Sequence, residues 1–176
     1  MGLGRAVFLD RDGVLNMSKV INGKPYAPRK FKDFHIYSYV PEALQRLNRQ
    51  GFILAVVTNQ PDVGNGKTDK REVDLMHQAL MEQTPIDTIE TCFHSRKSEC
   101  ECRKPKIGLL LKVAEGFGVD PSKSFMVGDR RGDILAGQAF GCNTIFINRG
   151  YKEPPPKNYW ADALDLRDAV NKILGT

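Results

Sequence analysis

An apolar run that ends in two acidic residues constrains the fold more than any other stretch of this chain. Residues 6–9 read Ala-Val-Phe-Leu, and Asp10, Arg11, Asp12 and Gly13 follow directly. A continuous apolar run bounded by a turn signal predicts a buried strand. In an open parallel sheet, ligands bind beyond the carboxyl ends of the strands, so we expect the two carboxylates to take part in chemistry there.

Two other structures fit the Asp-x-Asp-Gly pattern when it is considered alone. The commoner one is a solvated turn. The other is a calcium loop, but an EF-hand requires a third oxygen ligand before its glycine and an acidic residue at its twelfth position. The twelfth position counted from Asp10 is Ile21. Whether the pattern is a site therefore depends on partners supplied by the rest of the chain.

Size and charge narrow the class of protein. A chain of 176 residues that is 41% hydrophobic predicts one compact domain, residues 1–176. No apolar run approaches the roughly 20 residues that span a bilayer, and no signal peptide precedes the first strand, so we expect a cytoplasmic protein without membrane contact. The net charge of +5 favours anionic partners. The basic residues lie in small groups separated by acids, which argues against a nucleic-acid surface.

The rest of the chain alternates between strand and helix patterns, which predicts a mainly parallel α/β sandwich. Strands are expected at 52–57, 86–93, 124–129 and 143–147, and helices at 41–51, 69–83, 106–118, 134–140 and 164–174. Residues 16–38 are polar and interrupted by prolines, so we expect a long loop with little regular structure. A loop of this length is usually functional. We expect it to cover the site, with Lys24, Tyr26 and Arg29 as candidate substrate contacts.

Polar residues follow the other strands just as they follow the first one. Thr58 ends the second strand and can donate a hydroxyl hydrogen bond, although Thr-Asn is equally common as the start of an ordinary turn. Asp129 ends a later strand, and Asp133 lies at the start of the next helix. These residues are expected at one edge of the sheet, together with the acids of the first strand.

Three cysteines and one histidine lie within eleven residues and predict a metal site. Zn²⁺ prefers four tetrahedral nitrogen or sulfur ligands, and a closed set of four protein ligands indicates a structural role. Unliganded thiols are the alternative. Residues 92–102 are therefore expected to form a zinc-binding loop that fixes Arg103 and Lys104 in space. The four candidate ligands are Cys92, His94, Cys100 and Cys102.

Carboxylates, a hydroxyl and a lysine on one face predict a Mg²⁺ and phosphate site. At this point the chain resembles the haloacid dehalogenase (HAD) superfamily of phosphatases. The resemblance rests on Asp-x-Asp-Gly, a strand-terminal Thr-Asn, Lys-Pro and Gly-Asp-x-x-x-Asp, in that order along nearly the whole chain. The Cys-x-His and Cys-x-Cys-Arg-Lys-Pro motifs make it similar to the branch of heptose bisphosphate and histidinol-phosphate phosphatases. That branch has no large cap domain, and the spacing of the motifs leaves no room for one.

The resemblance implies a mechanism and a role for each residue. Asp10 is the nucleophile that forms an aspartyl-phosphate, and Asp12 is the general acid and base. Mg²⁺ is held by the Asp10 carboxylate, the Asp12 backbone carbonyl and Asp129, with support from Asp133. The resemblance also implies that Thr58 and Lys104 bind the phosphoryl oxygens. The remainder of the substrate is contacted by Asn59, Gln60, Arg103 and Arg130.

The sequence departs from this branch in regions that face the substrate. Residues 61–66 read Pro-Asp-Val-Gly-Asn-Gly, with Asn65 where an arginine is expected. The loop after Asn16 is longer, and the zinc loop is shorter. We expect a monomer acting on a small phosphorylated sugar of lipopolysaccharide or capsule precursor synthesis. Histidinol phosphate, a 3′-terminal nucleic-acid phosphate and a zinc-clipped binding module without catalysis are the alternatives.

Overall fold

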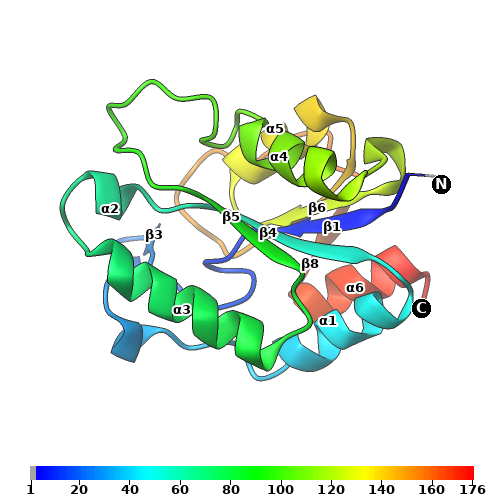
Figure 1. The fold of residues 1–176 in the computed structure, drawn as a ribbon, viewed down its shortest axis with the longest axis horizontal. Coiled ribbons are helices and arrows are strands. Elements are labelled where there is room, and N and C mark those ends of the chain that lie inside the picture. The colour runs from blue at the N-terminus through cyan, green and yellow to red at the C-terminus, as the bar shows by residue number, and fades with distance from the viewer. Residues whose placement is uncertain (1–2) are drawn as a thin grey trace.

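A six-stranded sheet in which all neighbouring strands run parallel forms the centre of the computed structural model, which describes residues 3–176 (Figure 1). This architecture confirms the predicted α/β class. The strand order is β5-β4-β1-β6-β7-β8. In that order the strands are Thr88–Cys92, Ile53–Asn59, Ala6–Leu9, Phe125–Gly128, Asn143–Ile147 and Ala161–Ala163. The last strand, β8, was not predicted.

Helices cover both faces of the sheet (Figure 1). On one face lie α4 (Gly108–Phe117) and α5 (Arg131–Phe140). On the other face lie α1 (Val40–Arg49), α3 (Lys70–Gln83) and α6 (Leu166–Leu174). A one-turn helix α2 (Pro61–Gly64) follows β4, and short 3-10 helices occupy Phe31–Asp33 and Pro121–Lys123.

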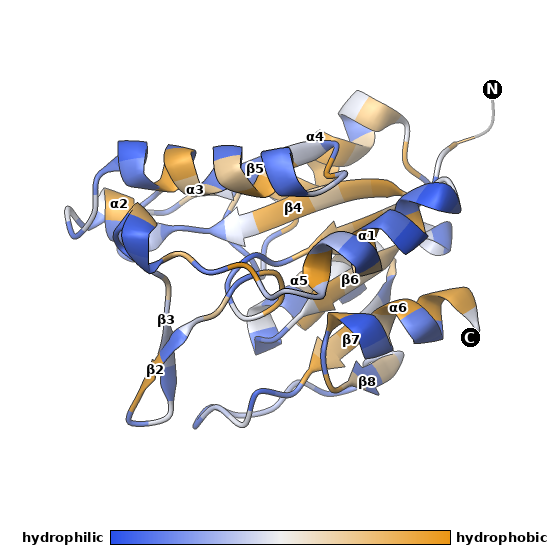
Figure 2. Cartoon of the chain, turned by 90° about the horizontal axis from the view of Figure 1, so that it is seen from below, coloured by the Kyte–Doolittle hydropathy of each residue, from blue (hydrophilic) through white to orange (hydrophobic). Residues whose placement is uncertain are grey.

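Strand β1 is buried on both sides, as its continuous apolar sequence predicts. Ala6 and Phe8 pack toward α4 and α5, whereas Val7 and Leu9 pack toward the opposite helices. All four side chains have no exposed surface. The apolar strands therefore lie between two layers of helices, and the outer faces of these helices are polar (Figure 2). A strand buried on both faces lies in the middle of the sheet, so the carboxyl end of β1 lies at the middle of the sheet's carboxyl edge.

The expectation of an irregular loop at 16–38 was wrong. The segment contains an antiparallel hairpin of β2 (Lys19–Ile21) and β3 (Lys24–Tyr26), in addition to the first 3-10 helix. Asn22 and Gly23 connect the strands, and both have positive φ, 52° and 79°. An Asn-Gly pair is a strong hairpin signal because it adopts this backbone easily. The flanking strands are largely exposed and lack apolar alternation, which explains why the hairpin was overlooked.

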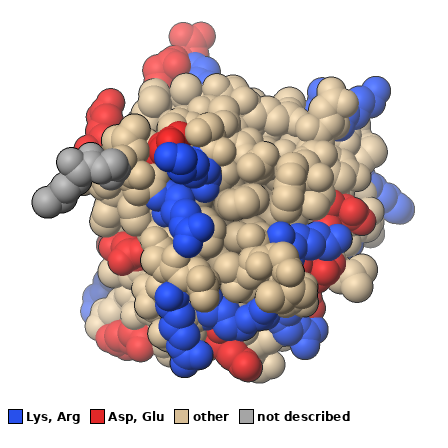
Figure 3. All heavy atoms as spheres, turned by 90° about the vertical axis from the view of Figure 1, so that its right-hand side faces the viewer, with Lys and Arg blue, Asp and Glu red and all other residues tan. Residues whose placement is uncertain are grey.

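The face at the amino ends of the strands carries charges of both signs. Lys and Arg side chains lie there in small groups, with Asp and Glu between them (Figure 3). This arrangement agrees with the scattered basic residues of the sequence. None of the helices within residues 3–176 has the length and apolar character needed to cross a membrane.

Candidate active site

The polar residues that end the strands meet at a cavity of about 500 Å³ at the carboxyl edge of the sheet. Asp10 and Asp12 follow β1, Asp129 follows β6, and Lys104 comes from the loop before α4. Most of the predicted site residues line this cavity: Asp10, Asp12, Asn59, Gln60, Arg103, Lys104, Asp129, Arg130 and Asp133. Thr58 is buried and lies next to Gln60. Of the candidate loop residues, Tyr26 lines the cavity, and Arg29 instead pairs with Asp62.

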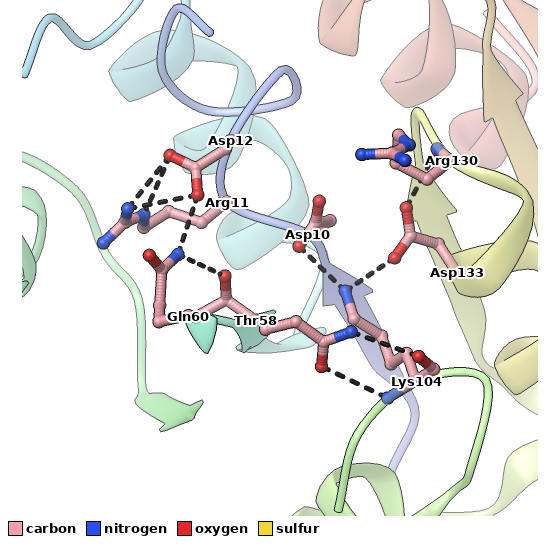
Figure 4. Close-up of polar contacts among 9 residues, drawn as sticks. Asp10, Arg11, Asp12, Thr58, Gln60, Lys104, Arg130 and Asp133 are labelled. Carbon is pink, nitrogen blue, oxygen red and sulfur yellow. Dashed lines mark hydrogen bonds and ion pairs between the residues drawn. The ribbon is translucent and has the colours of Figure 1, made fainter. Parts of the chain in front are cut away.

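Lys104 is a buried cation between two carboxylates. Its Nζ lies 2.8 Å from Asp10 Oδ1 and 2.6 Å from Asp133 Oδ1 (Figure 4). Burial alone would lower the pKa of Lys104, but the two carboxylates raise it above its usual value. Burial, followed by the nearby charge of Asp133, raises the pKa of Asp10 to about 6 even though Lys104 opposes this shift. The amine therefore stays charged beside a crowded group of acids.

Asp10, Asp129 and Asp133 form a candidate metal centre. One carboxylate oxygen from each lies within 4.8 Å of those of the other two. Burial and the charge of Asp10 raise the pKa of Asp129 well above its usual value. Asp129 Oδ1 is buried and has no hydrogen-bond partner among the described residues. Hard oxygen donors with an unused lone pair are the ligands that Mg²⁺ prefers, so the residues fit this ion.

The Asp12 carboxylate is held by three neighbouring side chains, and Figure 4 shows two of them, Arg11 and Gln60. Arg11 donates to both of its oxygens at 3.0 and 3.1 Å, Asn16 donates at 2.9 Å and Gln60 at 2.7 Å. Arg11 is fully buried, and its Nη1 lies 3.1 Å from the Nε2 of His77. Burial and the Arg11 charge lower the pKa of His77 to about 4, so the imidazole is neutral.

Arg11 and His77 were not predicted as parts of the site. An arginine between two acids ordinarily projects into solvent, and a single histidine in a helix is ordinarily a partly exposed surface residue. His77 is indeed partly exposed, but its ring faces Arg11. The guanidinium carbon of Arg11 also lies 5.5 Å from the centroid of the Phe34 ring. That contact brings together residues far apart in the sequence.

Asn59 and Gln60 connect the end of β4 to the other site residues. The Asn59 amide donates to the Lys104 carbonyl at 3.1 Å and accepts from the Lys104 backbone N–H at 3.2 Å. Gln60 Nε2 donates to Thr58 Oγ1 at 2.9 Å as well as to Asp12. These contacts orient Lys104 and Asp12 from the same strand end.

The two predicted arginines border the cavity while making contacts within the protein. Arg103 Nη2 donates to the His94 carbonyl at 2.7 Å and also to the carbonyl of Ser95. Arg130 is paired with Glu153, whose oxygens lie 2.7 and 2.6 Å from its Nε and Nη2. Arg103 is therefore attached to the cysteine-rich loop, as the sequence predicts for that position.

The cysteine and histidine side chains of residues 92–102 converge as a possible metal site. Cys92 Sγ lies 3.8 Å from Cys100 Sγ and 3.5 Å from His94 Nδ1, and Cys102 Sγ lies 3.1 Å from the same nitrogen. A tetrahedral zinc with usual bond lengths separates two sulfurs by about 3.8 Å and sulfur from nitrogen by about 3.6 Å. Two of the three distances match this geometry and the third is shorter, and three thiols with one imidazole are a donor set that zinc prefers. Cys142 is buried elsewhere, in the core between the sheet and α5.

Comparison with known proteins gives matches along nearly the whole chain. The HAD-hydrolase-like family matches residues 101–169. The D-glycero-beta-D-manno-heptose-1,7-bisphosphate 7-phosphatase of Helicobacter pylori is 30% identical over 98% of this chain and 99% of its own. The enzyme of that name from Pseudomonas aeruginosa is 34% identical over 82% and 81%. A crystal structure of the D,D-heptose 1,7-bisphosphate phosphatase of B. bronchiseptica with magnesium and phosphate has a TM-score of 0.81 and 25% identity, covering 97% of this chain and 98% of that one.

Proposed function

This chain belongs to the HAD-like family of D-glycero-beta-D-manno-heptose-1,7-bisphosphate 7-phosphatases, and from that membership we propose that it hydrolyses the 7-phosphate of this sugar bisphosphate. It is thus a phosphoric monoester hydrolase. The observation that carries the proposal is the match to the Helicobacter pylori enzyme, which extends over 98% of the chain.

We infer that Asp10 is the nucleophile. Its carboxylate attacks phosphorus, the bond from phosphorus to the sugar oxygen breaks, and an aspartyl-phosphate forms. Asp12 gives a proton to the leaving alkoxide and then takes one from the water that hydrolyses the aspartyl-phosphate. The contact of 2.8 Å between Lys104 and Asp10 supports a role for the ammonium group in neutralising the phosphoryl oxygens. Thr58 is the proposed hydroxyl donor to the same oxygens.

Two metals are part of the proposal. Mg²⁺ would be held by the carboxylates of Asp10 and Asp129 and the backbone carbonyl of Asp12, with Asp133 supporting them. When bound, it supplies positive charge that draws the nucleophile and the phosphate together. The structure of the B. bronchiseptica relative contains magnesium, which supports this ion. Zn²⁺ would be held by Cys92, His94, Cys100 and Cys102, in a closed set that serves structure rather than catalysis.

Substrate specificity is assigned to the residues at the rim of the cavity. Asn59, Gln60, Arg103 and Arg130 are the proposed substrate contacts, and the basic groups suit a second phosphate on the sugar. We further propose that residues 1–176 act as a single domain, as a cytoplasmic monomer without a nucleic-acid partner. Asn65 stands where the branch commonly has arginine, which makes the sugar the part of the proposal that most needs a direct test.

The test is phosphate release in Mg²⁺ over a panel of substrates. The panel contains both anomers of the heptose 1,7-bisphosphate, histidinol phosphate, fructose 1,6-bisphosphate and a 3′-phosphorylated oligonucleotide. We expect kcat/KM for the β anomer to exceed that for histidinol phosphate and the other non-heptose substrates at least 100-fold, which corresponds to about 2.7 kcal/mol of transition-state discrimination. Equal or faster hydrolysis of histidinol phosphate or the oligonucleotide would overturn the assignment of substrate.

A further inference from the structure

The segment after β7 crosses the carboxyl edge of the sheet and contacts the site at several points. We call residues 148–153 the strap. Arg149 Nε donates to the Gly13 carbonyl at 2.9 Å, and the Lys152 N–H donates to the carbonyl of Gly23, in the hairpin turn, at 2.8 Å. Nothing in the sequence motifs marks this segment as functional, because it lies between the last predicted strand and a proline-rich crossing.

Tyr151 of the strap contacts a proposed metal ligand directly. Its hydroxyl donates to Asp129 Oδ2 at 2.7 Å. A phenol hydroxyl can donate a hydrogen bond and a carboxylate oxygen can only accept one, so Tyr151 is the donor in this contact. The other oxygen, Asp129 Oδ1, is buried and has no hydrogen-bond partner within residues 3–176. The tyrosine therefore holds one oxygen of the carboxylate while the other stays free to bind a metal.

The space around this hydrogen bond is closed by Gly13. A Cβ atom at position 13 would lie 1.8 Å from Asp129 Oδ2 and 2.9 Å from the Tyr151 hydroxyl. The backbone of the Asp-Gly turn thus packs against the hydrogen bond. Arg149 fixes the same turn through the Gly13 carbonyl. The strap therefore restrains both Asp129 and the turn that directly follows Asp12.

We propose that Tyr151 is a positioning residue for Mg²⁺, which sets the rotation of the Asp129 carboxylate so that Oδ1 faces the ion. The proposal rests on the proposed function for the identity of the metal. Groups that hydrogen-bond to metal-binding carboxylates orient them, and their loss typically weakens metal affinity 10–100-fold. Tyr151 would act on the ion through Asp129 and would not touch the substrate.

The test is calorimetric titration of the full-length protein with Mg²⁺, comparing wild type with Tyr151→Phe. This variant removes only the hydroxyl. The matched control is Tyr159→Phe, because it also removes one tyrosine hydroxyl, and the Tyr159 ring packs against Phe146. We expect Tyr151→Phe to raise the Kd for Mg²⁺ at least 10-fold, with kcat at saturating Mg²⁺ within about twofold of wild type. Tyr159→Phe should leave the Kd unchanged.

Two results would overturn the inference while leaving the proposed function intact, and a third would overturn the proposed metal chemistry as well. A Kd for Tyr151→Phe within twofold of wild type would refute the positioning role. A lower binding stoichiometry with an unchanged Kd would show that the hydroxyl only supports folding. If the wild-type protein binds no Mg²⁺, the proposed metal chemistry fails along with this inference.

Discussion

Lys104→Met tests whether the site is organised around a buried cation. The Nζ atom lies 2.8 Å from Asp10 and 2.6 Å from Asp133, and the Lys104 side chain is 2% exposed. At an effective dielectric constant of about 20, each contact corresponds to about 6 kcal/mol of Coulombic attraction, much of it offset by desolvation. Removing one partner of a buried ion pair costs roughly 3–5 kcal/mol, because the remaining charges stay buried without compensation.

The assay is thermal unfolding of the metal-free protein at neutral pH. For a chain of this length, 1 kcal/mol shifts Tm by roughly 2–4 °C, so the substitution should lower Tm by roughly 6–20 °C. Saturating Mg²⁺ should raise the Tm of the variant part of the way back to that of wild type. A bound ion at about 100 times its Kd stabilises a protein by about 2.7 kcal/mol. The restored stability would come from the positive charge placed among the three carboxylates.

Lys112→Met is the matched control. Lys112 Nζ lies 2.6 Å from Glu90, which is as close as the buried contact, but the Lys112 side chain is 68% exposed. Exposed pairs contribute about 0–1 kcal/mol, so Tm should fall by at most roughly 4 °C. If the two substitutions lowered Tm equally, the reasoning that burial makes Lys104 important would be refuted.

Three further substitutions address other parts of the site. Asp10→Asn should reduce turnover to below a few per cent of wild type with an unchanged circular dichroism spectrum, and greater residual activity would exclude Asp10 as nucleophile. Cys100→Ser should lose bound zinc, measured by atomic absorption. It should also lower kcat, because Arg103 is attached to that loop. An unchanged kcat in the zinc-free variant would disprove the coupling between the zinc loop and the active site. The pKa of His77 is about 4 in the folded protein and about 6.5 when unfolded, so stability is lost as the pH falls from 6.5 toward 4. His77→Gln should remove this loss of stability at low pH. Identical slopes of Tm against pH in the variant and the wild type would contradict the prediction.

The sequence predicted the sheet and the convergence of its strand ends well, for a physical reason. Buried parallel strands are continuous apolar runs, and each such run here stops at a polar residue, which marks the carboxyl edge directly. The sequence could therefore bring Asp10, Thr58 and Asp129 together at this edge, whereas Lys104 was predicted from the cysteine-rich loop that precedes it. Their roles in catalysis remain predictions that the substitutions above address.

The parts that could not be predicted depend on packing between distant segments. Arg11 lies over the Phe34 ring and faces His77, which is 66 residues further along the chain. Tyr151 reaches Asp129 across 22 residues, from a segment with no regular structure. Neither contact has a local pattern, since each arises only when the sheet is complete. The hairpin at β2 and β3 is different, because its Asn-Gly turn is a local signal that the sequence itself carries.

The central place of β1 means that the site is completed late in synthesis of the chain. Ala6 pairs with Ile53, but the other edge of β1 waits for β6, where Val7 pairs with Phe125, 118 residues later. At roughly 5–20 residues per second, a ribosome needs roughly 6–24 s to make that stretch. During this interval one edge of an apolar strand has no partner, and Asp10 lacks both Lys104 and Asp129 for much of it. The unpaired edge of β1 therefore exposes the growing chain to aggregation during this interval, and the proposed phosphate site forms only after Lys104, Asp129 and Asp133 have been made.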